Sequence, residues 1–116
     1  MIKVEAVVIR ERVETVIDAV EHGTGHVGVT VIEAIGHGRQ RGVTHEYRGQ
    51  IFESRFLPKA HLMFIVEDDL ADSVVEAIVD AARSGNESGD GLAWTSTVDN
   101  VTHNRTGTKL EKGVEA

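Results

Sequence analysis

Residues Ile2–Ile9 read IKVEAVVI, a short run dominated by valine, isoleucine and alanine that predicts a mostly buried β-strand. The run ends at Arg10-Glu11-Arg12, and a different period then begins. The next apolar residues follow the i, i+3, i+4, i+7 spacing of one helix face: Val13, Val16, Ile17 and Val20. Gly23 is a suitable residue to end this helix. The chain therefore opens with a strand that passes directly into an amphipathic helix.

Three further segments are expected to be strands: Val27–Ile35, Leu62–Val66 and Leu92–Val98. Between the first two of them lies Arg39–Ser54, a polar tract that contains glycine and has no helical period and only weak strand character. A tract of this length is uncommon between elements of a compact domain, and such tracts are often functional. We therefore expect a long loop at this place.

A second helix is expected after Leu62–Val66, with Glu67-Asp68-Asp69 as its N-cap and acidic first turn and Gly85 as its end. Its buried stripe is predicted at Leu70, Val74, Ile78, Ala81 and Ala82. The order is then strand, helix, strand, long loop, strand, helix, strand. This order predicts an α+β, ferredoxin-like βαββαβ sandwich, in which two helices cover one face of an antiparallel sheet.

Composition excludes several classes of protein. The 116 residues fit one small domain, which an oligomer would help to stabilise. The absence of cysteine excludes a disulfide scaffold, a cysteine nucleophile and a cysteine zinc site. A net charge of −7 and 4% aromatic residues argue against nucleic-acid binding. No signal peptide and no run long enough to span a bilayer is present, so we expect a cytoplasmic protein with no direct membrane insertion.

Three tracts could hold an anion: Gly36–Gly42, Ser84–Gly91 and His103–Gly107. Glycine backbone N–H groups and arginine side chains can bind phosphate or carboxylate, although a solvated loop has the same composition. The six histidines show no metal-ligand spacing, and no serine lies in a nucleophile motif. The residues themselves therefore do not favour an enzyme.

These tracts together resemble the P-II signal-transduction proteins, trimeric regulators of nitrogen and carbon metabolism. The resemblance rests on the ordered motifs GHGRQRG (36–42), YRG (47–49), FLPK (56–59), GDG (89–91) and RTG (105–107). It implies one domain over residues 1–107, with a partner-binding T-loop at about 38–57 and a B-loop at about 84–91. Residues 108–116 are then expected to form a flexible tail.

The resemblance also implies a non-enzymatic homotrimer that binds ATP or ADP, and AMP as a further candidate, in clefts between subunits. The implied nucleotide-binding residues are Thr30, Gly38, Arg39, Gln40, Gly89, Asp90, Gly91, His103 and Arg105. Gln40 would also help to bind Mg²⁺ and 2-oxoglutarate when ATP is present, and Lys59 would pair with a 2-oxoglutarate carboxylate. The T-loop, with Tyr47, Arg48 and Phe52, would contact a membrane transporter or a metabolic enzyme.

The chain departs from the family pattern at three places. Leu92 stands where the family has a lysine, His103 where it has an arginine, and Phe52 where many members have a modified tyrosine. The first two changes remove positive charge, so weaker ATP binding or a shift towards ADP or AMP is expected. An alternative is a divergent sensor of another small effector, such as bicarbonate, in inorganic-carbon metabolism. A structural or metal-tolerance trimer and a small enzyme are less favoured.

Overall fold

A computed structural model of the chain describes residues 1–37, 44–47, 50–53, 56–83 and 89–110. The strands are β1 (Ile2–Ile9), β2 (Thr30–Gly36), β3 (Thr44–Tyr47), β4 (Gln50–Glu53), β5 (Leu57–Val66) and β6 (Leu92–Thr97). The helices are α1 (Val13–Thr24) and α2 (Ala71–Ala82), each preceded by a short 3₁₀ turn, Arg10–Arg12 and Asp68–Leu70.

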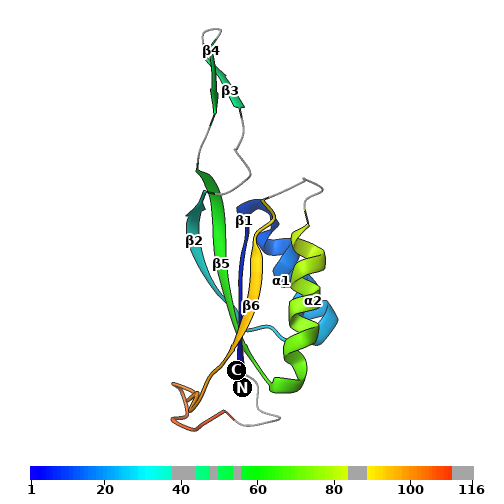
Figure 1. The fold of residues 1–116 in the computed structure, drawn as a ribbon. Helices are drawn as coiled ribbons and strands as arrows, with labels where there is room; N and C mark the ends of the chain where they lie inside the picture. Colours follow the sequence, from blue (N-terminus) through cyan, green and yellow to red (C-terminus); the bar gives the residue numbers. More distant parts are fainter. Residues whose placement is uncertain (38–43, 48–49, 54–55, 84–88, 111–116) are drawn as a thin grey trace.

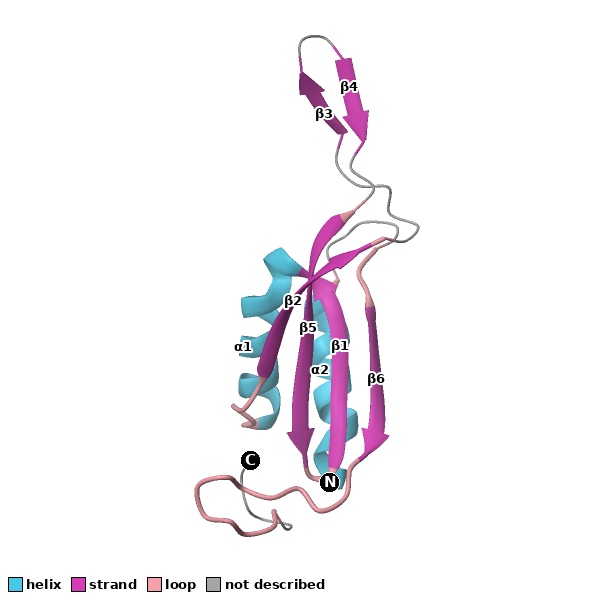
Figure 2. Cartoon of the chain, turned by 90° about the vertical axis from the view of Figure 1, so that its left-hand side faces the viewer, coloured by secondary structure: helices cyan, strands magenta, loops and turns pink. Residues whose placement is uncertain are grey.

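Four strands form one antiparallel sheet in the order β2-β5-β1-β6. Both helices cover the same face of this sheet, and none of the described helices or strands covers its other face (Figure 2). The predicted ferredoxin-like arrangement is therefore confirmed. The separate hairpin β3–β4 lies beyond the end of the sheet at which β2 finishes and β5 begins (Figure 1).

The core lies between the sheet and the two helices. Alternate residues of the central strands point inward, and the helices add the apolar stripes that the sequence predicts. Its largest fully buried side chains are Phe64, Leu62, Ile78, Val4, Val8, Val16, Val20, Val66 and Val74. A strand with period two and a helix with period 3.6 can both bury one face in this way, which is why the two patterns were readable in the sequence.

Both helices end at residues other than those predicted. Helix α1 continues through Gly23 to Thr24, and the left-handed residue that ends it is Gly25, with φ 78° and its N–H bonded to the Glu21 carbonyl. Helix α2 ends at Ala82, because Arg83 is extended, and Gly85 lies outside the described residues. The predicted N-cap is also corrected: Glu67 makes no side-chain capping hydrogen bond.

Two strand boundaries differ from the prediction. Strand β2 begins three residues later than expected, at Thr30, and includes Gly36. Strand β5 begins at Leu57 rather than at Leu62, because Pro58 is tolerated where β5 has a single neighbour. β1 pairs with β5 only from Lys59 onward, so Pro58 removes no bond to a central strand. Leu57, the last residue of the predicted T-loop, therefore belongs to strand β5.

The tract Arg39–Ser54 was predicted without regular strands, and the structure corrects this with the hairpin of β3 and β4. At the other end of the sheet, the chain after β6 folds back on itself. Leu110 N–H bonds the Val101 carbonyl, and His103 N–H bonds the Thr108 carbonyl, at 2.8 Å each. Residues 108–110 are thus hydrogen-bonded to the chain, whereas 111–116, the rest of the predicted tail, lie outside the described residues.

One long-range contact fixes the end of α2. The guanidinium of Arg12 donates two hydrogen bonds to the Ala81 carbonyl, from Nε at 3.0 Å and from a terminal nitrogen at 2.6 Å. Carbonyls in the last turn of a helix have no partner within the helix, so this arginine supplies one from the start of α1.

Candidate functional site

A cleft of about 390 Å³ opens on the uncovered face of the sheet, at the end nearest the hairpin. It is lined by Val7, Gly36, His37, Leu57, Lys59, Gly89, Gly91, Leu92 and Trp94. The antiparallel register brings these residues together, because Gly36 pairs with Leu57 and Leu92 pairs with Val7. All four strands of the sheet therefore contribute to one site.

Lys59 is the central charged residue of this cleft. It lies in β5 between Ile9 and Ala34, is only 8% exposed, and its Nζ donates a 2.6 Å hydrogen bond to the Gly89 carbonyl. Burial lowers the pKa of Lys59, and the nearby Asp90 carboxylate partly opposes that shift. The effector-binding lysine that the resemblance implies thus lies at the bottom of a cleft, already bonded to the predicted B-loop.

Glycines leave room for this arrangement. A Cβ on Gly36 would lie 2.7 Å from Cγ of Lys59, so the lysine stem can lie over the strand only if residue 36 is glycine. Gly91 has φ 91°, and a Cβ there would lie 1.7 Å from the Val7 carbonyl oxygen. Gly91 is thus required by the backbone, and Gly36 makes room for the Lys59 side chain, which accounts for part of the predicted glycine motifs.

Asp90 lies between the two B-loop glycines but does not line the same cleft. With Gly91 and Leu92 it lines a second cavity of about 100 Å³, beside the C-terminal end of α2. Gly89 and Gly91 therefore line the cleft, Asp90 lines the second cavity, and nucleotide binding by all three stays a prediction.

The predicted residues of the C-terminal motif lie elsewhere. His103 and Arg105 follow β6 at the opposite end of the sheet, where Val98 N–H bonds the Met1 carbonyl (Figure 1). Nδ1 of His103 is buried with no hydrogen-bond partner in the described part of the chain, and Arg105 is exposed. Within one chain, the predicted nucleotide-binding residues therefore fall into two groups at opposite ends of the sheet.

The remaining predicted residues are only partly described. Thr30 is exposed and begins β2 opposite Met63, part-way along the sheet. Gly38, Arg39, Gln40 and Arg48 lie outside the described residues. Of Tyr47 and Phe52 the structure describes the backbone alone, in β3 and β4 of the hairpin.

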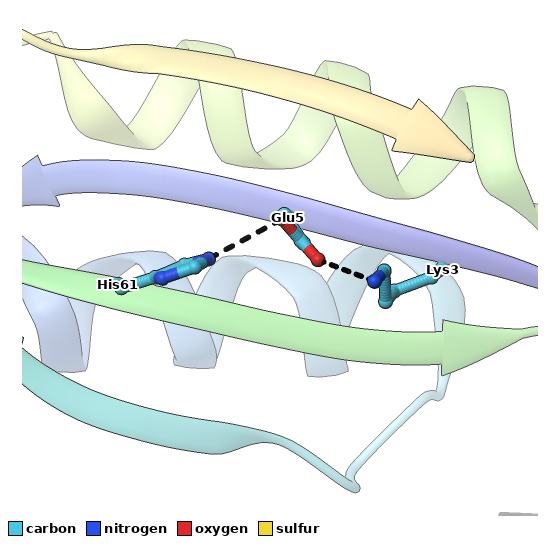
Figure 3. A network of polar contacts seen from close by, with 3 residues as sticks. All are labelled: Lys3, Glu5 and His61. Carbon is cyan, nitrogen blue, oxygen red and sulfur yellow. Dashed lines mark ion pairs between the residues drawn. The ribbon is translucent and has the colours of Figure 1, made fainter.

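A polar cluster that the sequence reading missed lies on the same open face (Figure 3). Glu5 is 8% exposed, with Oε1 at 2.8 Å from Lys3 Nζ and Oε2 at 3.4 Å from His61 Nε2. The hydrogen bond from Lys3 holds the pKa of Glu5 below its ordinary range, against the opposing effect of burial. The ring of His61 packs on Trp94 with centroids 5.7 Å apart. The sequence signal that could have revealed this cluster is the spacing of Lys3, Glu5 and Val7 at every second residue of β1, which places all three on one face of the sheet.

No three histidine or carboxylate side chains gather into a possible metal site within the described residues. Among the helices that the structure describes, none is long and apolar enough to cross a membrane. The Mg²⁺ ligand that the resemblance implies, Gln40, is not among those residues.

Comparison with known proteins agrees with the fold and with the resemblance found in the sequence. The family described as "Nitrogen regulatory protein P-II" matches residues 1–108. "Nitrogen regulatory protein P-II 2" of Methanothermobacter thermautotrophicus is 40% identical over 114 residues, 98% of this chain and 97% of the relative. "Nitrogen regulatory protein P-II" of Microchaete diplosiphon is 43% identical, and that of Synechocystis 42%, each over 100% of this chain and 99% of the relative. This chain therefore belongs to the nitrogen regulatory protein P-II family.

Proposed function

We propose that this protein is a non-enzymatic signal-transduction regulator that binds ATP or ADP in clefts between the subunits of a homotrimer. Gly89 and Gly91 contribute to the nucleotide site, and Lys59 pairs with a carboxylate of 2-oxoglutarate. The hairpin β3–β4 contacts a transporter or a metabolic enzyme. The observation that carries this proposal is the position of the cleft, between Lys59 and Gly89, at the end of the sheet nearest the hairpin. A ligand bound there can alter the segment that a partner contacts.

Assembly follows from the separation of the two groups of predicted residues. Lys59, Gly89 and Gly91 lie at one end of the sheet, and His103 and Arg105 at the other. A second copy that brings its own C-terminal turn to the cleft would complete the site. The uncovered sheet face supports association, because Ile32 and Trp94 there are 51% and 39% exposed.

The specificity for nucleotide depends on two substitutions. Leu92 lines the cleft and is 76% exposed, where the family pattern has a lysine, and His103 replaces an arginine. A charge-assisted hydrogen bond is worth ~1.5–3 kcal/mol, so each loss weakens phosphate binding roughly ten- to hundredfold. This favours ADP or AMP over ATP. It also supports the second candidate function, a sensor of a different effector such as bicarbonate in inorganic-carbon metabolism.

Calorimetric titration of the purified protein with ATP, ADP and AMP, with and without Mg²⁺, tests the proposal. 2-oxoglutarate and bicarbonate are then titrated against the nucleotide-loaded protein and against its Lys59→Ala variant. A 2-oxoglutarate response that Lys59→Ala abolishes supports the nitrogen regulator. A bicarbonate response that Lys59→Ala leaves unchanged supports the second function. Absence of binding by any nucleotide would refute the first function, and absence of a bicarbonate response as well would refute the second.

A mixing experiment tests whether the cleft is shared between copies. As pure trimers, Lys59→Ala is expected to lose 2-oxoglutarate binding and Arg105→Ala to bind nucleotide weakly, so neither binds 2-oxoglutarate tightly in the presence of Mg²⁺-ATP. Co-expressed, they form mixed trimers in which one cleft combines an intact Lys59 with an intact Arg105 of the next copy. Partial recovery of tight binding is therefore expected. No recovery in mixed trimers isolated with two different tags would show that both residues act within one chain.

A further inference from the structure

The segment Gly89–Gly91, which leads into β6, contacts the sheet at both of its glycines. Gly91 lies against the backbone of β1, at the Val7 carbonyl. The carbonyl of Gly89 accepts the 2.6 Å hydrogen bond from Lys59, which lies 30 residues earlier in the chain. Both glycines have positive φ, 89° and 91°, which a residue with a Cβ rarely adopts. The bond from Lys59 therefore ties the first glycine of the segment to a central strand.

The fold determines where the ammonium of Lys59 lies. Lys59 pairs with Ile9 on one side and with Ala34 on the other, and the residue is 8% exposed. Its stem runs across Gly36, where an added Cβ would lie 2.7 Å from Cγ and 3.0 Å from Cε of the lysine. The side chain therefore loses its rotamer freedom when the chain folds, and not when a ligand binds.

A hydrogen bond from this ammonium orients a whole peptide group. A bond with an ionised donor is stronger than a bond between neutral groups. Because the peptide is planar, fixing the Gly89 carbonyl also fixes the direction of the Asp90 N–H. Backbone N–H groups can bind an anion, and a segment that is already ordered loses less conformational entropy when it does so. The segment Gly89–Gly91 is thus arranged before a ligand arrives.

We propose that Lys59 is a positioning residue of the nucleotide site, in addition to its pairing with 2-oxoglutarate. Through the Gly89 carbonyl it holds the segment Gly89–Gly91 in the conformation that binds nucleotide. The affinity for nucleotide then depends on Lys59 even when no 2-oxoglutarate is present. The inference rests on the proposed function and deepens it, because it adds a residue that acts on the nucleotide through this segment.

Hydrogen exchange of the ligand-free, full-length protein tests the segment, and calorimetric titration with ADP tests the consequence for nucleotide. Lys59→Met keeps a stem of similar length but removes the donor. We expect the amides of residues 89–92 to exchange roughly tenfold faster in this variant, while those of β1 and α1 exchange as in the wild-type protein. ADP should bind roughly ten- to hundredfold more weakly in the absence of 2-oxoglutarate.

Two further variants separate the position of the ammonium from its charge. Gly36→Ala keeps the lysine but places a Cβ where its stem lies, and Gly36 is not among the glycines with positive φ, so its backbone accepts alanine. It should reproduce the faster exchange of residues 89–92. Lys3→Met removes a lysine that pairs with Glu5 on the same open face, and this matched control should keep wild-type exchange there and wild-type affinity for ADP. Circular dichroism of each variant excludes misfolding as the cause of a change.

The outcomes separate this inference from the proposed function. Unchanged exchange of residues 89–92 in Lys59→Met overturns the inference, whatever the affinity for ADP, and so does faster exchange with an unchanged affinity. Wild-type exchange in Gly36→Ala, or an equal change in Lys3→Met, would also overturn it, because the charge and not the position of the ammonium would then be the cause. A wild-type protein that binds no nucleotide refutes the proposed function, whereas the exchange data still decide whether Lys59 holds the segment.

Discussion

Gly91 is the position at which a single methyl group should disturb the cleft most. It precedes β6, has φ 91°, and approaches the backbone of the central strand β1 so closely that an added Cβ would lie 1.7 Å from the Val7 oxygen. Contacts of a Cβ with another atom below 3.0 Å essentially do not occur. Gly91→Ala must therefore move β6 away from β1, since the atom in the way is backbone and cannot rotate aside.

The expected loss of stability has two parts. The left-handed conformation costs a residue with a Cβ roughly 1–2 kcal/mol. Forcing extra volume into a packed site costs about 1–3 kcal/mol more. Together they give roughly 2–5 kcal/mol, a large fraction of the ~5–15 kcal/mol by which a domain is stable.

Two other glycines allow the conformational cost and the packing cost to be measured separately. Gly25 and Gly107 also have positive φ, 78° and 69°, but a Cβ on either would meet nothing within 4 Å. Gly25→Ala and Gly107→Ala should therefore show the conformational cost alone. The three variants are compared by urea denaturation at one protein concentration, because association would otherwise shift the midpoints. If Gly91→Ala lost no more stability than Gly25→Ala, the close approach to Val7 would be refuted.

Three further predictions concern charged groups. Arg12→Met leaves a helix-end carbonyl without its partner and should lower the free energy of unfolding by about 1–3 kcal/mol in urea, whereas Arg10→Met, which breaks an exposed ion pair, should cost less than about 1 kcal/mol. The hydrogen bond from Lys3 holds the pKa of Glu5 below its ordinary 4.5. The stability that Glu5 contributes is therefore present above pH 4.5 and is lost as the pH falls through the lower pKa of the folded state. Thermal unfolding of Glu5→Gln across the acid range should not show this loss. Burial lowers the pKa of Lys59 below 10.5 in the folded protein. Between the folded pKa and 10.5 the unfolded chain binds more protons than the folded one, so the free energy of unfolding should rise with pH there. Lys59→Met should show no such rise in urea titrations over that range.

The fold was predictable because its main elements carry strong periods. The strand Ile2–Ile9 has the predicted bounds, and β6 and α2 differ from theirs by a few residues. The predicted ends of strands and helices were wrong where tertiary contacts, and not the local sequence pattern, determine where an element begins or ends. Leu57 and Pro58 read as loop, yet they extend β5 because β2 pairs with them.

The hairpin was missed for a different reason. Thr44–Tyr47 and Gln50–Glu53 are short and mixed in polarity, so neither has a period that four residues can reveal. The spacing of two residues between them was the usable signal, since it is typical of a hairpin. The resemblance placed a protruding loop here, and the strands within it add regular structure to that loop.

The site was predictable only in its chemistry. The glycine motifs and the family resemblance predict that these residues bind an anion, which stays a prediction, and the structure places Gly89, Gly91 and Lys59 in one cleft. Its apolar walls could not be foreseen, because Val7 and Trp94 reach it through strand register and not through sequence proximity. The Lys3, Glu5 and His61 cluster is likewise a product of pairing between β1 and β5.

The same register explains why the proposed binding and the proposed assembly depend on each other. β6 starts at the cleft with Leu92 and runs antiparallel to β1 for six residues, or ~17 Å, before the turn that carries His103 and Arg105. No rotation of a side chain spans that distance, so in the proposed site these residues come from another copy. A substitution that dissociates the oligomer should therefore weaken nucleotide binding even when every cleft residue is intact. Ile32→Lys on the open face, outside the lining of the cleft, provides that case, and tight nucleotide binding by a monomeric Ile32→Lys protein would contradict a shared site.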